Sequence, residues 1–121
     1  MTAPRAAVYR WADVETDIPM PTIQRKRIIG EKAMISHILL AKGTHVPTHS
    51  HEPEQIGVVL RGRIRFGVGA DGSKDRYEVT IGEGEVIHLP SNVPHSADAI
   101  EETLILDIFS PPAAATGVDR K

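Results

Sequence analysis

Apolar and polar side chains alternate with a period of two along most of this chain. In segment 63–68, for example, Ile64, Phe66 and Val68 alternate with two arginines and a glycine, so the apolar residues share one face of an extended segment. We find no segment with the 3.6-residue apolar spacing of an amphipathic helix. The pattern predicts an all-β chain with strands at 23–29, 33–41, 55–60, 63–68, 76–80, 85–89 and 103–109.

Turn-forming residues separate these segments, as in Lys42-Gly43 and Arg61-Gly62. Many short strands in a chain of this size close most readily into a sandwich or barrel, because closure protects the strand edges. We therefore expect one barrel domain at 23–110, an N-terminal arm at 1–22 and a C-terminal tail at 111–121.

Composition narrows the possible partners and compartments. The chain has 121 residues, of which 40% are hydrophobic, which suits a single domain with its own core. A net charge of -2 gives no general attraction to nucleic acid or to an anionic membrane. Cysteine is absent, which excludes disulfides and thiolate metal ligands. Because the N-terminus also lacks a long apolar run, we expect a cytoplasmic protein. With nucleic acid and membrane disfavoured as partners, we expect a small-molecule substrate.

The segment around His49 and His51 concentrates residues that bind metals. One residue separates these two histidines, so on an extended segment both imidazoles project to the same side and can bind one divalent ion. Gln55 lies close by in sequence and could add its amide oxygen, and His95 follows a second segment rich in glycine and proline. Solvent-exposed surface histidines are the alternative, but the two segments support each other and favour one divalent metal ion per subunit.

Both segments resemble the two conserved motifs of the cupin superfamily. The first motif, G-x5-H-x-H-x3-E-x6-G, is matched with all its spacings by Gly43, His49, His51, Gln55 and Gly62. The second, G-x5-P-x-G-x2-H-x3-N, is matched by Gly84, Pro90, Asn92, His95 and Ala99. Departures from the motifs occur at Gln55, Asn92 and Ala99. The resemblance covers roughly residues 24 to 110 and implies a single cupin barrel, a double-stranded β-helix or jelly roll. Cupins commonly dimerise, so it also implies a homodimer.

A closer resemblance is to the small cupins of pectin and alginate degradation, which open the ring of 4,5-unsaturated uronates. It rests on His-Ser-His with Gln55, on Asn-Val-Pro-His95 and on Leu-Asp107-Ile-Phe109-Ser-Pro-Pro. In that family, the positions matching His49, His51, Gln55 and His95 hold the metal. Those matching Asp107 and Phe109 take part in ring opening, and a family arginine that meets the substrate carboxylate corresponds to Ala113. The zinc-dependent polyketide-cyclase cupins are similar in kind.

Two further residues are candidates for proton transfer. Asp107 shares a face of its strand with Ile105 and Phe109, where a charge costs several kcal/mol unless it is paired or hydrogen-bonded. It is therefore either a structural partner of another group or part of the pocket. His88, just before Pro90, could line the pocket or be a hydrogen-bonded wall residue, as could His37.

An amide in place of a carboxylate ligand leaves the charge of a divalent ion uncompensated, which favours Lewis-acid chemistry without redox. We therefore expect a ring-opening, isomerase, lyase or cyclase reaction on a small carbonyl substrate such as a sugar acid. Three imidazoles and an amide suit zinc or nickel, with iron and manganese also possible. A metal-dependent dioxygenase and a non-catalytic binding or sensor cupin are the alternatives.

Overall fold

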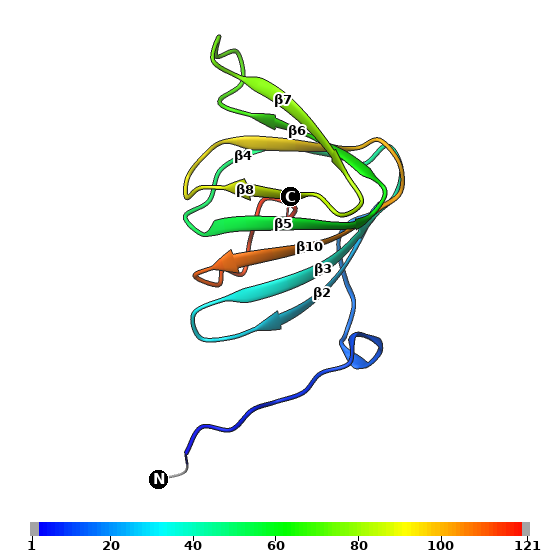
Figure 1. Ribbon diagram of the computed structural model, residues 1–121, viewed down its shortest axis with the longest axis vertical. Helices are drawn as coiled ribbons and strands as arrows, with labels where there is room; N and C mark the ends of the chain where they lie inside the picture. Colours follow the sequence, from blue (N-terminus) through cyan, green and yellow to red (C-terminus); the bar gives the residue numbers. More distant parts are fainter. Residues whose placement is uncertain (1–2, 120–121) are drawn as a thin grey trace.

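The computed structural model describes residues 3–119, which form two antiparallel β-sheets facing each other (Figure 1). The elements, in chain order, are η1 (Trp11–Asp13), β1 (Asp17–Met20), β2 (Ile23–Ile29), β3 (Met34–Leu40), β4 (His45–His49), β5 (Glu54–Arg61), β6 (Arg63–Val68), β7 (Tyr77–Gly82), β8 (Val86–Leu89), β9 (His95–Ala99) and β10 (Thr103–Ser110). Within this part of the chain, no helix has the length and apolar character needed to cross a membrane.

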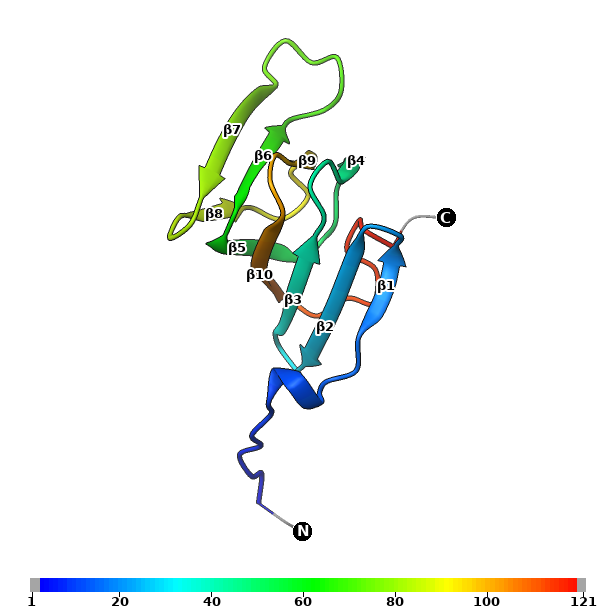
Figure 2. The ribbon, with the colours of Figure 1, turned by 90° about the vertical axis from the view of Figure 1, so that its right-hand side faces the viewer.

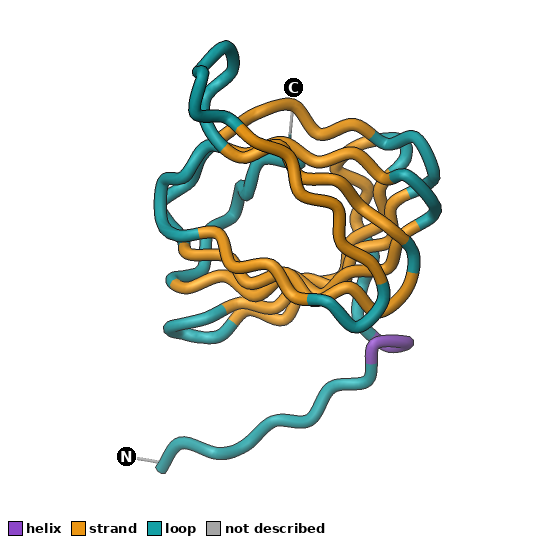
Figure 3. The backbone as a smooth tube through the Cα atoms, turned by 45° about the horizontal axis from the view of Figure 1, so that its top comes forward, coloured by secondary structure: helices purple, strands orange, loops and turns teal. Residues whose placement is uncertain are grey.

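The six-stranded sheet has the order β1-β2-β3-β10-β5-β8, and the four-stranded sheet has the order β4-β9-β6-β7. All pairings are antiparallel, and the last strand, β10, lies between β3 and β5 at the centre of the larger sheet. The two sheets curve around a common interior (Figure 3). This arrangement confirms the predicted all-β jelly-roll barrel.

The core lies between the sheets and follows from the period-two pattern. Ile38, Ile105 and Val59 are neighbours in register on β3, β10 and β5, and all are buried. Ile64 and Phe66 contribute to the same core from β6 of the smaller sheet. Burying each such side chain contributes about 1.5–3 kcal/mol, so these alternating positions supply much of the driving force for closing the barrel.

Three observed strands were not predicted from the alternation. β1 lies inside the segment expected to be an arm, where Asp17 pairs with Arg25 of β2. β4 contains Pro47, and β9 has the sequence His-Ser-Ala-Asp-Ala, so neither carries a strong apolar pattern of its own. They become strands because they pair with each other and because β9 also pairs with β6.

The two ends of the chain behave differently. Residues 3–10 extend away from the barrel, whereas residues 111–119 turn back to the barrel and end beside β1 and β2 (Figure 2). The guanidinium of Arg25 on β2, which is only 2% exposed, is paired with Asp17 and with Asp119 of this tail. The predicted C-terminal tail is thus part of the folded structure up to the last described residue.

Candidate metal centre

The fold brings the three motif histidines together. His49 ends β4 and pairs in register with His95, the first residue of β9, while His51 lies in the loop after β4. The ring centroids of His49 and His95 are 4.4 Å apart, and those of His51 and His95 are 5.1 Å apart. One ligand nitrogen from each of the three imidazoles lies within 4.8 Å of the others, which suits a shared metal ion.

Backbone carbonyls fix the orientation of all three rings. Nδ1 of each histidine is hydrogen-bonded to a carbonyl oxygen two residues away in sequence, at distances of 2.8, 2.8 and 2.9 Å for His49 with Pro47, His51 with Pro53 and His95 with Val93. Since a carbonyl can only accept, each Nδ1 carries a proton, which leaves Nε2 as the nitrogen of each ring that can bind a metal in the neutral form. This is the tautomer that binds a metal through Nε2, with the backbone holding the ring in place.

His95 is buried and uncharged at neutral pH. Burial lowers its pKa to about 4, with the carbonyl of Val93 acting in the opposite direction and the two nearby histidines adding to the decrease. A metal ligand must be neutral imidazole, so the protein supplies this ligand in the required form.

Gln55 joins this group from β5. Its Oε1 lies 3.1 Å from Nε2 of His51, and its Nε2 donates a hydrogen bond to Oδ1 of Asp107 at 3.0 Å. The contact with Asp107 turns the amide oxygen of Gln55 toward His51. Imidazole nitrogen and amide oxygen both bind divalent ions, so the donor set fits a bound divalent ion.

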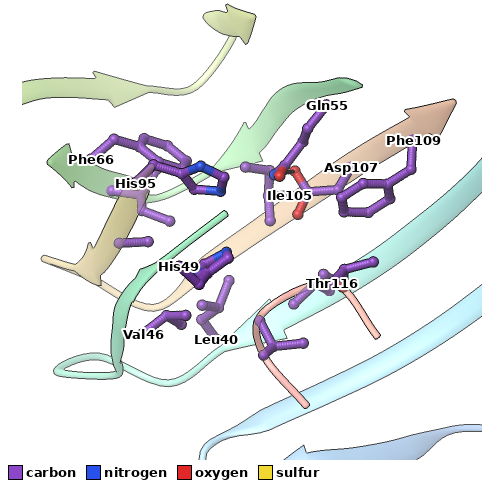
Figure 4. Close-up of a pocket in the computed structure, with 14 residues that line it drawn as sticks. Leu40, Val46, His49, Gln55, Phe66, His95, Ile105, Asp107, Phe109 and Thr116 are labelled. Carbon is purple, nitrogen blue, oxygen red and sulfur yellow. Dashed lines mark hydrogen bonds between the residues drawn. The ribbon is translucent and has the colours of Figure 1, made fainter. Parts of the chain in front are cut away.

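Asp107 is the acidic member of the site. Its carboxyl group lies beside the Gln55 amide and points into the cavity (Figure 4). Burial raises the pKa of Asp107 to about 7, although the hydrogen bond from Gln55 acts in the opposite direction. Gly57, its cross-strand partner, makes room for this carboxyl, because a Cβ there would lie 2.9 Å from Oδ1 of Asp107. Asp107 can therefore exchange a proton near neutral pH.

The remaining surface of the cavity is mostly apolar. Phe109 is buried and meets the ring of His51 edge-on, with centroids 5.6 Å apart. The cavity has a volume of about 40 Å³, enough for an ion and one or two water-sized molecules. Its other walls come from both sheets and from the tail: Ile38, Leu40, Val46, Ile64, Phe66, Ala97, Ile105, Thr116 and Val118.

Sequence reasoning missed the contribution of the tail. Thr116 is 5% exposed, and the backbone at Gly117 lies so close to the ring of His49 that a side chain there would overlap it. Val118 packs against the core. Residues 111–119 are mostly small or polar and show no period, so nothing in the sequence identifies them as a wall of the site.

His88 lies outside the cavity, contrary to the prediction that made it a pocket candidate. Leu89 faces the core, so the alternation along β8 turns His88 to the outer surface, where its Nε2 lies 2.6 Å from Oε2 of Glu54. His37 also faces outward, with its ring 4.9 Å from that of Trp11. The structure thus brings together His49, His51, Gln55, His95, Asp107 and Phe109, but not His88.

Comparisons with known proteins agree with this geometry. The Cupin domain family model matches residues 36–109. The fold is similar to that of KdgF from Halomonas sp., with a TM-score of 0.80 and 23% identity over 91% of this chain and 97% of that one. It is also similar to an RmlC-like cupin from Shewanella frigidimarina, with a TM-score of 0.79 and 21% identity over 91% and 95% of the two chains.

A larger protein shares the fold as well. Oxalate decarboxylase from Bacillus subtilis has a TM-score of 0.74 and 18% identity over 88% of this chain, which spans 30% of that protein. No curated protein sequence matches the chain. The family match covers most of the barrel, including both histidine segments, and the structural similarities extend over nearly the whole chain. This chain belongs to the cupin family.

Proposed function

We propose that this protein is a metal-dependent enzyme that acts without redox on a small oxygenated carbonyl compound, with a sugar acid as the substrate class. His49, His51, Gln55 and His95 would hold one divalent ion, zinc or nickel, in each subunit. The observation that carries the proposal is the hydrogen bond from the Gln55 amide to Asp107, because it places a protonatable acid next to a metal ligand on the wall of one cavity.

The four ligands are all neutral, so a bound divalent ion would keep its full charge and would act as a Lewis acid that polarises a substrate oxygen. Asp107 supplies the proton chemistry. Oδ1 accepts from Gln55, while Oδ2 accepts from no described residue and is left to take a proton from the substrate and return it. Without the ion the pKa of Asp107 is about 7, and a bound cation would favour the carboxylate, which is the form that accepts a proton.

Phe109 and the apolar wall would exclude water from this exchange. Phe109 is buried against His51, and Ile105 lies beside Asp107 on the same face of β10. A low-polarity surrounding strengthens the interaction of the ion and of Asp107 with a polar substrate.

Ring opening of 4,5-unsaturated uronates is the specific reaction that we propose within this class. The residues shared with the uronate-opening cupins support it, as does the similarity of the fold to KdgF from Halomonas sp.. The alanine at position 113, where that family has an arginine, means that a substrate carboxylate would need another partner.

The test is turnover by the zinc-loaded and nickel-loaded protein. We expect loss of the unsaturated-uronate absorbance near neutral pH and strongly reduced turnover in Asp107→Asn, which keeps the size of the side chain. His88→Ala is the matched control and should keep full activity. Turnover that is unaffected in Asp107→Asn would contradict the assigned role of this residue.

A dioxygenase is the second candidate function, and the size of the cavity favours it. A space of about 40 Å³ that is lined by His49 and His95 admits a diatomic molecule without any rearrangement. This reading calls for iron or manganese in the same ligands, and oxygen uptake by the iron-loaded protein would distinguish it from the first. Metal binding with neither turnover nor oxygen uptake would indicate a binding or sensor cupin.

A further inference from the structure

The C-terminal segment 114–119 covers the cavity. Thr116 and Val118 line it, and Gly117 lies against the ring of His49. The cavity volume of about 40 Å³ is far below the roughly 300–1,000 Å³ of sites that hold ordinary small-molecule ligands. All of its other lining residues belong to strands, so this segment is the part of the wall that can move without breaking a sheet.

Two arginines of β2 hold the segment in place. Nη1 of Arg27 donates to the carbonyl oxygen of Ala114 at 2.8 Å. Arg25 donates to both carboxylate oxygens of Asp119, from Nη1 at 3.0 Å and from Nη2 at 2.7 Å. The two arginines alternate with outward-facing residues, and Ile23 on the same face belongs to the core, so both start from the inner face of β2.

The same face connects these arginines to the acid of the site. Arg27 pairs in register with Ser36 of β3, and Ser36 pairs with Asp107 of β10. With about 4.8 Å between neighbouring strands, the Cα atoms of Arg27 and Asp107 lie about 10 Å apart. Between them, the hydroxyl of Ser36 is buried and has no hydrogen-bond partner among residues 3–119. A cation, an unpaired hydroxyl and a protonatable acid thus follow one another across the inner face of the sheet.

The charge balance of this row depends on the segment. Asp17 and Asp119 are the acidic groups within 4.0 Å of the two guanidinium groups in the described structure. When the segment is in place, the two carboxylates balance the two arginines. Displacement of the segment removes Asp119 and the Ala114 carbonyl, which leaves two arginines facing one carboxylate.

We propose that segment 114–119 is an internal competitor of the substrate, and that Arg25 and Arg27 form a carboxylate-binding subsite once the segment is displaced. The Asp119 carboxylate and the Ala114 carbonyl occupy these donors in the closed state. In the open state a substrate carboxylate takes their place, and the other end of the substrate reaches Asp107 and the metal ligands. This inference rests on the proposed function for its substrate class, but binding alone tests it.

The test is calorimetric titration of the zinc-loaded protein with D-galacturonate and with D-galactose. The two sugars differ only at C6, where galacturonate has a carboxylate and galactose has a hydroxymethyl group. Asp119→Asn removes the competing charge and should tighten galacturonate binding by about 3- to 10-fold, because the binding-competent state becomes more populated. Arg27→Gln should weaken galacturonate by about tenfold and leave galactose unchanged. Arg61→Gln, on the exposed end of β5, is the matched control and should alter neither.

A merely structural ion pair predicts the opposite result for Asp119→Asn, namely a lower melting temperature with galacturonate binding that is unchanged or weaker. That result would overturn the proposal, as would a retained preference for galacturonate in Arg27→Gln or absence of galacturonate binding in both wild type and Asp119→Asn. Carboxylate-selective binding without turnover would leave the subsite standing and reject the proposed function. Turnover of a neutral carbonyl substrate without carboxylate preference would support a carbonyl enzyme and reject the carboxylate subsite.

Discussion

Gln55 and Asp107 are joined by a hydrogen bond of 3.0 Å between neighbouring strands β5 and β10, with the amide nitrogen of Gln55 as the donor. This contact turns the amide oxygen of Gln55 toward the histidines, so it couples a candidate metal ligand to the acid of the site. Because the pKa of Asp107 in the metal-free protein is about 7, a small change in this contact alters the protonation of the acid near neutral pH.

Replacing Gln55 by Glu should keep the metal and change the pH dependence of the reaction. Two carboxyl groups about 3 Å apart cannot both ionise easily, so we expect the pKa of Asp107 to rise and turnover at pH 7 to fall by about tenfold or more. The measurement is the pH profile of kcat beside the metal content. Glu54→Gln, on the outer face of the same strand, is the control, and an unchanged profile in Gln55→Glu would contradict the coupling.

The role of the histidines is tested by metal content. We expect His51→Ala to lose metal affinity by more than about 100-fold, because removing a ligand costs at least as much as removing a group that only supports one. Plasma mass spectrometry on untagged protein gives the metal per subunit. His88→Ala removes a histidine outside the cavity and should keep full occupancy. Equal occupancy in both variants would refute the ligand assignment.

The free energy of unfolding of the metal-free protein should depend on pH through Asp107. Its folded pKa of about 7 lies above the ordinary value of 3.8, so the folded state retains a proton that the unfolded chain releases. The stability that this group contributes is complete below pH 3.8 and is lost as the pH rises to about 7, by at most about 1.4 kcal/mol per pH unit.

Urea unfolding of the chelated wild type and of Asp107→Asn measures this effect. Asn cannot ionise, so the variant should gain stability relative to the wild type between pH 4 and pH 7.5. A difference between the two proteins that is independent of pH would show that Asp107 has an ordinary pKa in the fold. Adding zinc should lower the pH up to which the stability of the wild type depends on Asp107, because a nearby cation favours the carboxylate and lowers its pKa.

Gly57→Ala tests the space kept for the acid. The added Cβ would lie 2.9 Å from Oδ1 of Asp107 and 3.2 Å from side-chain carbons of Ile105 and Ile87. We expect a loss of about 1–3 kcal/mol in the free energy of unfolding, together with reduced activity. Gly82→Ala is the control, since the nearest atom to its new Cβ is 3.4 Å away. Equal stability of the two variants would show that the carboxyl group moves aside without cost.

The alternation of apolar residues and the spacing of the histidines were sufficient to predict the all-β barrel and to identify the segments that carry the candidate metal ligands. Both signals are local. Period two follows from the geometry of an extended chain, and the pair His49 and His51 shares a side wherever that chain lies. Asp107 was recognisable as unusual for the same reason, because it interrupts an apolar face.

The features that only the tertiary structure decided arise from contacts between distant segments. β4 and β9 are strands because they pair with each other, and the outward direction of His88 is set by which face of β8 meets the core. The orientation of the Gln55 amide needs Asp107, which is 52 residues away. The tail that lines the cavity is joined to β2 by the ion pair of Asp119 with Arg25, separated by 94 residues. No local pattern encodes such pairings, because each partner satisfies its hydrogen bonds and charge only when the whole chain has folded.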